Sequence, residues 1–439
     1  MPSLQEPDLI EDDRDAIDVL VPTLPSLRAL QRNTVRKPGL IFIFVTVVLD
    51  MLGIGIIIPS LPDLIRRYVD SPQGLAQLYG YFIAAYAVMQ FLAAPLLGAL
   101  SDLYGRRAIL LGSLFVAGLS YIAMAHAPNL EILFASRILA GIAGSSLTVA
   151  MAYIADISDE KNRAQNFGLI GGAFGLGFII GPALGGILGA KDLHYPFYAA
   201  ALMNFLNFLF GLFILPESLP QEKRRGFEIA RLNPLRSLQR TLSRPGFLGL
   251  FAGWFLFQFA AQTHGAIWTI YTQTRYSWTT AQVGLSLTVV GALSAISQGL
   301  LTKRIVSRLG EIKTVSVGII GYGASFVLYG LASEGWMLYA ILVGSAVFWV
   351  AGPALQSVIA AGVPASEQGE LQGSIVSTTS LASIVCPVVS TQLFSFFTST
   401  RTPVQIPGMP YFFGAAAALG AFLVFRPAFA ARSDGERAA

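Results

Sequence analysis

The chain has 439 residues, of which 54% are hydrophobic and only 12% are charged. Because soluble domains carry about 25% charged residues, this composition excludes an ordinary soluble enzyme and indicates a membrane protein with many spans. Its single cysteine, Cys386, excludes a disulfide framework. The sequence has no HExxH pair and no P-loop, so we expect neither a metal nor another cofactor. The net charge of +4 is expected of basic loops beside a membrane rather than of nucleic-acid binding.

Residues 1–39 are polar and acidic, and we expect them to form a cytoplasmic tail. Apolar runs of roughly 20 residues, the length that crosses a bilayer, follow at twelve places. The predicted spans are 40–60, 79–100, 108–126, 131–155, 165–189, 196–216, 246–273, 280–301, 313–332, 335–360, 368–397 and 408–427. The first span lacks a small-residue cleavage pattern, so we expect it to be retained. Residues 428–439 are predicted to form a second cytoplasmic tail.

The polar segment 217–245 separates the spans into two groups of six. It is basic and rich in proline, which predicts a cytoplasmic linker between an N-terminal half at 40–216 and a C-terminal half at 246–427. A short amphipathic helix on the membrane surface is expected within it. With the amino terminus inside, and leaving out Arg14, which is far from span 1, the cytoplasmic side holds 22 basic residues against 5 on the other side. This asymmetry fits the positive-inside rule with both termini in the cytoplasm.

A weak internal repeat relates the two halves. Gly168 and Gly373 are 205 residues apart, as are Pro182 and Pro387, and each pair lies in the fifth span of its half. Two six-span halves of related sequence are typical of transporters whose substrate site lies between the halves, near the middle of the membrane.

The loop between spans 2 and 3 carries the sequence Gly98-Ala-Leu-Ser-Asp-Leu-Tyr-Gly-Arg-Arg. Its glycines allow a tight turn, Asp102 is placed to face a helix N-terminus, and its arginines are placed to pair with acids. A basic turn that only sets the topology is the alternative. The spacing resembles the loop motif of the major facilitator superfamily, which implies an all-α integral membrane fold of twelve helices in two halves. The implied gating residues are Gly98, Asp102, Gly105, Arg106 and Arg107.

Span 5 contains a string of small residues that is similar to the signature of drug–proton antiporters in that superfamily. The string consists of Gly177, Gly181, Pro182, Gly185 and Gly186. Small residues permit close helix contact, and a proline inside a helix removes a backbone hydrogen bond and bends it. A packing face without a role in coupling is the alternative.

Within the superfamily the chain most resembles the tetracycline-efflux type. The matching stretches begin at Leu49, Pro59, Arg137, Pro196, Trp268, Glu334 and Pro353. Exporters of that type carry an acid in span 3, a histidine in span 8 and an acid in span 9, where this chain has Ser120, Ser294 and Tyr322. Since that family handles tetracycline as a metal chelate, the resemblance predicts proton-coupled efflux more firmly than it predicts the drug.

Two ionised side chains lie well inside the predicted spans, Asp50 in span 1 and Arg137 in span 4. A charge at the membrane centre costs roughly 2.5–3.5 kcal/mol, so such residues usually face a cavity, a partner or a pathway. Asp50 is the candidate carrier of the exchanged proton, since burial favours the neutral carboxyl group. Arg137 keeps its charge and is the candidate that tunes an acid. The alternatives for both are a structural ion pair or a side chain that reaches the membrane surface from near a helix end.

Polar and aromatic residues inside the spans are candidates for a substrate cavity, because aromatic walls with a few polar groups suit amphipathic compounds. The candidates are Gln90, Asn204, Gln258, Gln262, His264, Trp268, Tyr271, Gln298 and Gln356. Helix packing is the alternative for each of them, and for His264 in particular.

The sequence therefore predicts a monomeric, proton-coupled exporter of small amphipathic compounds in the bacterial inner membrane, working by alternating access. An uptake symporter of a metabolite on the same fold is the second hypothesis. A membrane enzyme or a receptor is the third, but the spans offer no convergent set of nucleophile, base or metal ligands.

Overall fold

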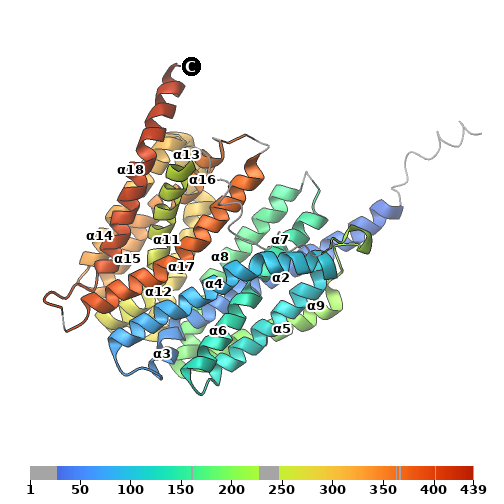
Figure 1. Cartoon of the computed structure of the whole chain (residues 1–439), viewed down its shortest axis with the longest axis horizontal. Coiled ribbons are helices and arrows are strands. Elements are labelled where there is room, and N and C mark those ends of the chain that lie inside the picture. The colour runs from blue at the N-terminus through green and yellow to red at the C-terminus, as the bar shows by residue number, and fades with distance from the viewer. Residues whose placement is uncertain are drawn as a thin grey trace, which may run out of the picture.

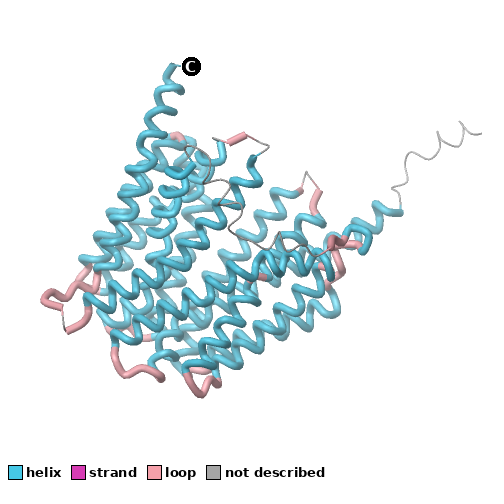
Figure 2. The backbone as a smooth tube through the Cα atoms, in the orientation of Figure 1, coloured by secondary structure: helices cyan, strands magenta, loops and turns pink. Residues whose placement is uncertain are grey.

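The computed structural model describes residues 27–159, 162–226, 247–361, 363–364, 367–400 and 402–438. The described residues form helices and short loops, with no strand among them. Most of the predicted acidic tail, residues 1–26, and most of the predicted linker, residues 227–245, lie outside the described residues. Figure 2 shows that the loops gather at two ends of the helices, as expected when every helix crosses the same layer.

Two groups of helices follow one another along the chain (Figure 1). The first comprises α2 (Leu27–Ile57), η1 (Ile58–Ser60), α3 (Leu61–Arg66), α4 (Pro72–Tyr104), α5 (Arg106–Ala125), α6 (Leu130–Gly144), α7 (Ser146–Ile157), α8 (Arg163–Lys191) and α9 (Tyr195–Ile214). A short 3-10 turn, η2 (Gln221–Lys223), follows. The second group comprises α11 (Phe247–Tyr276), α12 (Thr280–Ile296), η4 (Ser297–Leu301), α13 (Thr302–Leu309), α14 (Glu311–Leu331), α15 (Gly335–Ser345), η5 (Ala346–Val350), α16 (Ala351–Ala361), α17 (Gln368–Phe397) and α18 (Met409–Ala438).

Short polar residues start several of these helices by satisfying free backbone N–H groups. The hydroxyl of Ser71 accepts a hydrogen bond from the N–H of Gly74 at the start of α4. Asn129 accepts from the N–H of Ile132 at the start of α6. Thr279 and Gln282 form a reciprocal capping box at the start of α12. These caps fix tight turns at one end of the molecule.

Eleven segments among the described residues are long and apolar enough to cross a membrane. The predicted seventh span is present as the 30-residue helix α11, but it is not among the eleven, and it carries Gln258, Gln262 and His264. Its lower hydropathy is consistent with a helix that faces a polar interior rather than lipid.

Some helices extend beyond the predicted spans. The first helix begins at Leu27, before the predicted span at 40–60, and α18 continues through the predicted tail to Ala438. The fourth span divides at Ser145, whose hydroxyl donates to the carbonyl of Gln90 at 3.0 Å. Such side-chain bonds to backbone carbonyls bend helices, and hydropathy does not report them.

The internal repeat is visible in the backbone. Arg163 and Gln368, which begin α8 and α17, are 205 residues apart, and each helix contains its repeat proline. Gly105 and Gly310 are also 205 residues apart. Both have a positive φ, and they directly precede α5 and α14. The halves therefore share both helix register and turn geometry.

The apolar core shows how the halves meet. We call the end with loop 98–107 and segment 215–226 the linker end, and the opposite end, with loops 67–71 and 276–279, the distal end. One buried cluster joins the C-terminal half to distal residues of the N-terminal half, such as Leu61 and Phe82. A second cluster, which includes Phe42 and Tyr153, belongs to the N-terminal half alone and lies towards the linker end. Among the described residues, the halves thus share a core only towards the distal end.

Candidate functional site

The distal end is closed by direct contacts between the halves. The carboxylate of Asp63, on α3, accepts hydrogen bonds from the hydroxyl of Thr280 at 2.8 Å and from the amide of Gln273 at 3.4 Å. The amide of Gln392, on α17, donates to the hydroxyl of Tyr81 on α4 at 2.9 Å. These bonds fasten α3 and α4 of one half to α11, α12 and α17 of the other.

The linker end is open between the halves. Among the described residues, a Cβ atom added at Gly168, Gly171, Gly172 or Gly175, in the first half of α8, would meet nothing within 4 Å. The same is true of Gly299, on η4 in the other half. Glycine faces that should bring helices together are here uncovered, so the structure is a state with its interior open towards the linker end.

The second part of α8 carries the predicted antiporter string and is tightly packed. Gly177, Gly181 and Gly185 face α2, and a Cβ at Gly181 would lie 2.9 Å from the Cα of Gly55. Gly186 faces the other half, where a Cβ would lie 3.0 Å from the Cα of Gly284. The string therefore joins α8 to its own half on one side and to α12 on the other, with Pro182 inside the helix.

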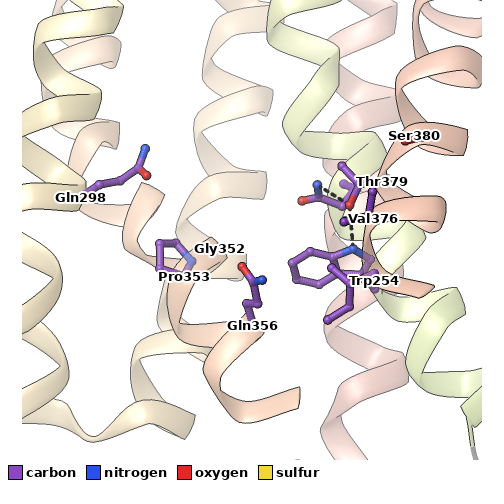
Figure 3. A pocket seen from close by; sticks show the side chains of 10 residues that line it. Trp254, Gln298, Gly352, Pro353, Gln356, Val376, Thr379 and Ser380 are labelled. Carbon is purple, nitrogen blue, oxygen red and sulfur yellow. Dashed lines mark hydrogen bonds between the residues drawn. The ribbon is translucent and has the colours of Figure 1, made fainter. Parts of the chain in front are cut away.

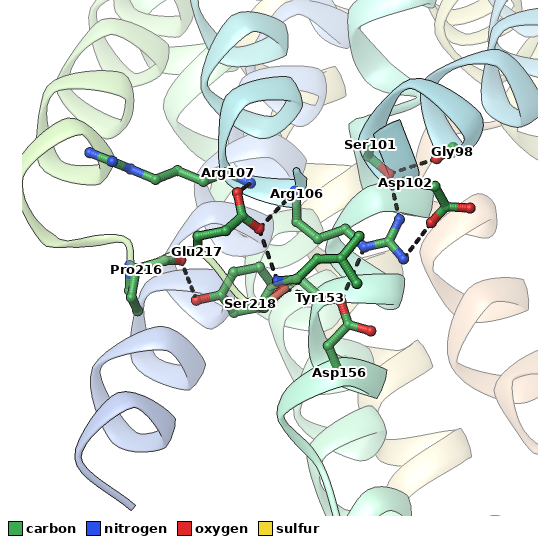
Figure 4. A network of polar contacts seen from close by, with 11 residues as sticks. Gly98, Ser101, Asp102, Arg106, Arg107, Tyr153, Asp156, Pro216, Glu217 and Ser218 are labelled. Atoms are coloured by element: carbon green, nitrogen blue, oxygen red, sulfur yellow. Dashed lines mark hydrogen bonds and ion pairs between the residues drawn. The ribbon is translucent and has the colours of Figure 1, made fainter. Parts of the chain in front are cut away.

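The loop between α4 and α5 is held by a polar network (Figure 4). The guanidinium of Arg106 lies 2.7 Å from a carboxylate oxygen of Asp102 and donates to Asp156 at 3.1 Å. Its third contact is the hydroxyl of Ser101, which donates to the carbonyl of Gly98 at 2.7 Å. The network ties the end of α4 to the end of α7.

Glu217, rather than Asp102, occupies the N-terminus of α5. Its carboxylate accepts the backbone N–H groups of Arg106 at 2.9 Å and of Arg107 at 3.3 Å, where the helix dipole favours a negative charge. Asp102 lies one turn earlier and pairs with Arg106 instead. The guanidinium of Arg107 donates a hydrogen bond to the carbonyl of Leu212 at 2.6 Å. The expectation that Asp102 caps a helix is thus wrong, because Glu217 reaches that position from the segment after α9.

Asp50 and Arg137 do not pair with each other. Among the described residues the carboxylate of Asp50 has no hydrogen bond and no ion pair, and its side chain is partly exposed. Arg137 is buried, with its guanidinium 4.3 Å from the ring centre of Tyr86 and 5.0 Å from that of Phe82. It also donates to the carbonyl of Phe82 at 3.3 Å. Aromatic faces thus stabilise its charge, while Asp50 has no partner in the part of the chain that the structure describes.

Two cavities lie in the C-terminal half. The linker-side cavity, about 440 Å³, is shown in Figure 3 and lies between α11, η4, α16 and α17. Its lining residues are Trp254, Gln258, Gln298, Gly352, Pro353, Gln356, Ile375, Val376, Thr379 and Ser380. The central cavity, about 330 Å³, is lined mainly by α11, α12, α14 and η5, with Phe178 contributed by α8 of the other half. Amides, hydroxyls and rings dominate both walls, as in sites for amphipathic molecules.

The structure brings five of the nine predicted cavity residues to these cavities: Gln258, Gln262, His264, Gln298 and Gln356. The remaining four are placed elsewhere. Trp268 and Tyr271 are fully buried and donate to Ser286 and to the carbonyl of Tyr329. Asn204 is buried in the N-terminal half, and the amide of Gln90 donates to the carbonyl of Gly144.

Sequence reasoning missed several lining residues. Trp254 and Thr379 face each other in the linker-side cavity, where the indole N–H donates to the hydroxyl at 3.0 Å (Figure 3). Trp349, Tyr329 and Ser345 line the central cavity. Trp254, Gln258 and Gln262 follow one another at intervals of four residues on α11, which places them on one face of the helix. This spacing could have identified Trp254 as a lining residue.

Two of the positions that depart from the tetracycline-efflux pattern, Ser294 and Tyr322, line the central cavity. The third, Ser120, is fully buried and donates to the carbonyl of Ala117. The central cavity thus has no carboxylate among its lining residues, and His264 is the one imidazole among them.

The other two histidines lie at the distal end. His194 lies within hydrogen-bonding distance of Arg67, at 2.9 Å, and of Asp192, and His126 contacts Tyr198. Hydrogen bonds from the backbone N–H and the ring of His194 hold the pKa of Asp192 below its usual value. These groups form a surface cluster outside both cavities.

Two halves of six helices, joined at one end, open at the other and enclosing uncharged cavities, define a membrane transporter of the alternating-access class. The chain belongs to the Major Facilitator Superfamily, which its sequence matches over residues 43–387 and 259–439. This superfamily consists of transporters, and within it the chain belongs with the tetracycline resistance proteins.

The relatives support that placement. The chain is 42% identical over 378 residues to the class C tetracycline resistance protein of Escherichia coli, covering 86% of this chain and 94% of that protein. It is 42% identical over 347 residues to the class G protein of Vibrio anguillarum, covering 79% and 88%. It is 26% identical over 371 residues to multidrug resistance protein 2 of Bacillus subtilis, covering 83% and 91%.

Solved structures give the same fold. The human organic anion transporter MFSD10 superposes with a TM-score of 0.64 at 26% identity, covering 89% of this chain and 99% of that one. The nucleoside transporter NupG superposes with a TM-score of 0.69 at 15% identity, covering 88% and 98%. The second likeness concerns the fold alone.

Proposed function

We propose that this protein exports small amphipathic compounds from the cytoplasm in exchange for protons. One observation carries the proposal: Asp50 is a membrane-embedded carboxyl group without a partner among the described residues, in a chain related to tetracycline resistance and multidrug resistance proteins. A carboxyl group in such a place is a functional site by default. The proton would bind Asp50 on one side of the membrane and leave on the other.

The transport cycle follows from the two ends. In the present state the linker end is open and the distal end is closed, so a compound enters the cavities from the linker end. Rocking of the halves would then close the linker end and open the distal end. One proton moving through about 150 mV supplies roughly 3.5 kcal/mol, which supports a compound gradient of a few hundredfold.

We further propose that the linker end faces the cytoplasm, that both termini lie there and that the protein works as a monomer in the inner membrane. The 22 basic residues counted on that side without Arg14, against 5 on the other, support the orientation. The antiporter string of α8 and the loop at 98–107 are the proposed coupling and gating elements.

We propose that the preferred substrate differs from that of the tetracycline resistance proteins in carrying no bound metal. Ser294 and Tyr322 place uncharged groups in the central cavity. We therefore expect compounds without a bound metal to be exported more efficiently than a tetracycline–metal chelate.

Proton release from everted membrane vesicles tests the proposal. A pH-quenched dye reports protons leaving as tetracycline, chloramphenicol, ethidium or tetraphenylphosphonium is added. We expect compound-dependent release that is lost in Asp50→Asn and kept in Asp70→Asn, which alters an exposed distal carboxylate. Release that persists in Asp50→Asn would remove Asp50 as the proton carrier. Accumulation of compound in right-side-out vesicles would instead favour an uptake symporter.

A further inference from the structure

Gln298 is the one residue that lines both the linker-side and the central cavity. It lies on η4, a five-residue π-helix that interrupts the path from α12 to α13. Figure 3 shows its side chain directed away from its helix, on the side of the cavity where Gly352 and Pro353 lie. Single π-turns inside α-helices often mark functional sites, because they turn a side chain out of the regular helical face.

The other amides of the cavities are engaged. Gln258 donates to the hydroxyl of Thr379 at 3.2 Å, Gln262 donates to that of Ser383, and Gln356 donates to the amide oxygen of Gln372 at 3.3 Å. Gln298 makes no hydrogen bond to any residue in the described part of the chain, and its side chain is exposed. A carboxamide offers two donors and an acceptor, and at Gln298 all of them remain available to a ligand.

The walls on either side of Gln298 differ. The central cavity is rich in rings, including Tyr322, Phe326 and Trp349. The linker-side cavity offers Trp254 and hydroxyl groups such as that of Ser380. A compound extending across the junction would place an aromatic body among the rings and a polar edge at Gln298.

We propose that Gln298 is a specificity-determining residue that hydrogen-bonds the polar edge of a substrate spanning both cavities. This rests on the proposed export function. The substrates it selects are compounds with an aromatic or alicyclic ring system and an amide group. Another polar group that has both a hydrogen-bond donor and an acceptor would serve in place of the amide. Compounds without such an edge occupy the cavities without using Gln298.

Two measurements test the assignment. In the first, Cys386→Ala removes the single native thiol, and Gln298→Cys is labelled with a maleimide in everted vesicles. We expect tetracycline or chloramphenicol to slow this labelling. Leu300→Cys is the control, since Leu300 lies on the same π-helix, is 58% exposed and lines neither cavity.

The second measurement compares the KM for compound-dependent proton release. Gln298→Leu should raise the KM for chloramphenicol about three- to tenfold, the effect of one lost hydrogen bond. The maximal rate, and the KM for tetraphenylphosphonium, which has no hydrogen-bonding group, should not change. Gln298→Asn should recover part of the loss.

The outcomes separate the two proposals. If the unsubstituted protein releases no protons with any compound, the export function fails. If it does release protons, but Gln298→Leu leaves every KM unchanged or raises the KM for tetraphenylphosphonium equally, Gln298 is not a specificity residue. Labelling of Gln298→Cys that no exported compound slows would overturn the assignment in the same way.

Discussion

Gly105 and Gly310 are the clearest cases in which one residue type is required by the backbone. Their φ and ψ angles, 102° and 152° for Gly105 and 76° and 163° for Gly310, lie in a region used almost only by glycine. Each starts a helix at equivalent places in the two halves. Their surroundings differ, because a Cβ at Gly105 would collide with Glu217, whereas one at Gly310 would meet nothing within 4 Å.

We expect Gly310→Ala to lower the free energy of unfolding by about 1–3 kcal/mol, the cost of backbone strain alone. Gly105→Ala should cost more, since it also displaces Glu217 from the N-terminus of α5. Thermal unfolding of the two purified variants in the same detergent gives the comparison. Equal losses would show that the contact between Glu217 and α5 adds nothing to stability.

At the scale of the element, α8 is a helix with two different parts. Its distal part, from Gly177 to Gly186, packs closely on α2 and α12. Its linker-end part buries Ile170 and Ala173 against its own half, but a Cβ added at any of its glycines from Gly168 to Gly175 would meet no other described residue within 4 Å. When the halves rock, we expect the face of α8 that meets α12 to separate from it in the distal part and to become covered in the linker-end part. In each state, α8 would then contact the other half at one of its two ends.

Gly186→Val should disfavour the present state, because overpacking costs about 1–3 kcal/mol and the Cα of Gly284 lies 3.0 Å from the added Cβ. Gly172→Val should instead hinder closure of the linker end. Maleimide labelling of Gln298→Cys should therefore fall in the first variant and rise in the second. Gly112→Val, on the exposed face of α5, is the control. The same change in labelling for both variants would contradict a rocking motion on α8.

At the scale of the whole molecule, the halves are held together by polar bonds at the distal end as well as by apolar packing. Asp63 accepts two hydrogen bonds from the other half. Polar bonds at a surface that must open are weak enough to exchange for water, while the shared apolar core towards the distal end is buried again in each cycle.

Joining Asp63→Cys to Thr280→Cys in the Cys386→Ala background, with a short bis-methanethiosulfonate cross-linker, should hold the distal end closed. Compound-dependent proton release should stop and return after reduction. Each single-cysteine variant, treated in the same way, should stay active. Full activity of the cross-linked protein would show that the distal end does not open during transport.

The comparison of sequence and structure turns on α11. Hydropathy predicted its position and length, and its amides pointed to a polar interior. The sequence did not show that Trp268 and Tyr271 pack in the buried core while Trp254 lines a cavity. All three are buried aromatic residues of one helix, and only its packing against α12, α14, α17 and α18 decides which of them borders a cavity.

The number and order of the spans, the two halves and the loop and glycine motifs were determined by the sequence alone, because a bilayer demands apolar runs of fixed length and tight contacts demand small residues. The tertiary structure decided three features: that Asp50 has no partner among the described residues, that Glu217 lies at the N-terminus of α5, and that Gln298 lies between two cavities. Each depends on side chains far apart in the chain, which come together only when the helices pack.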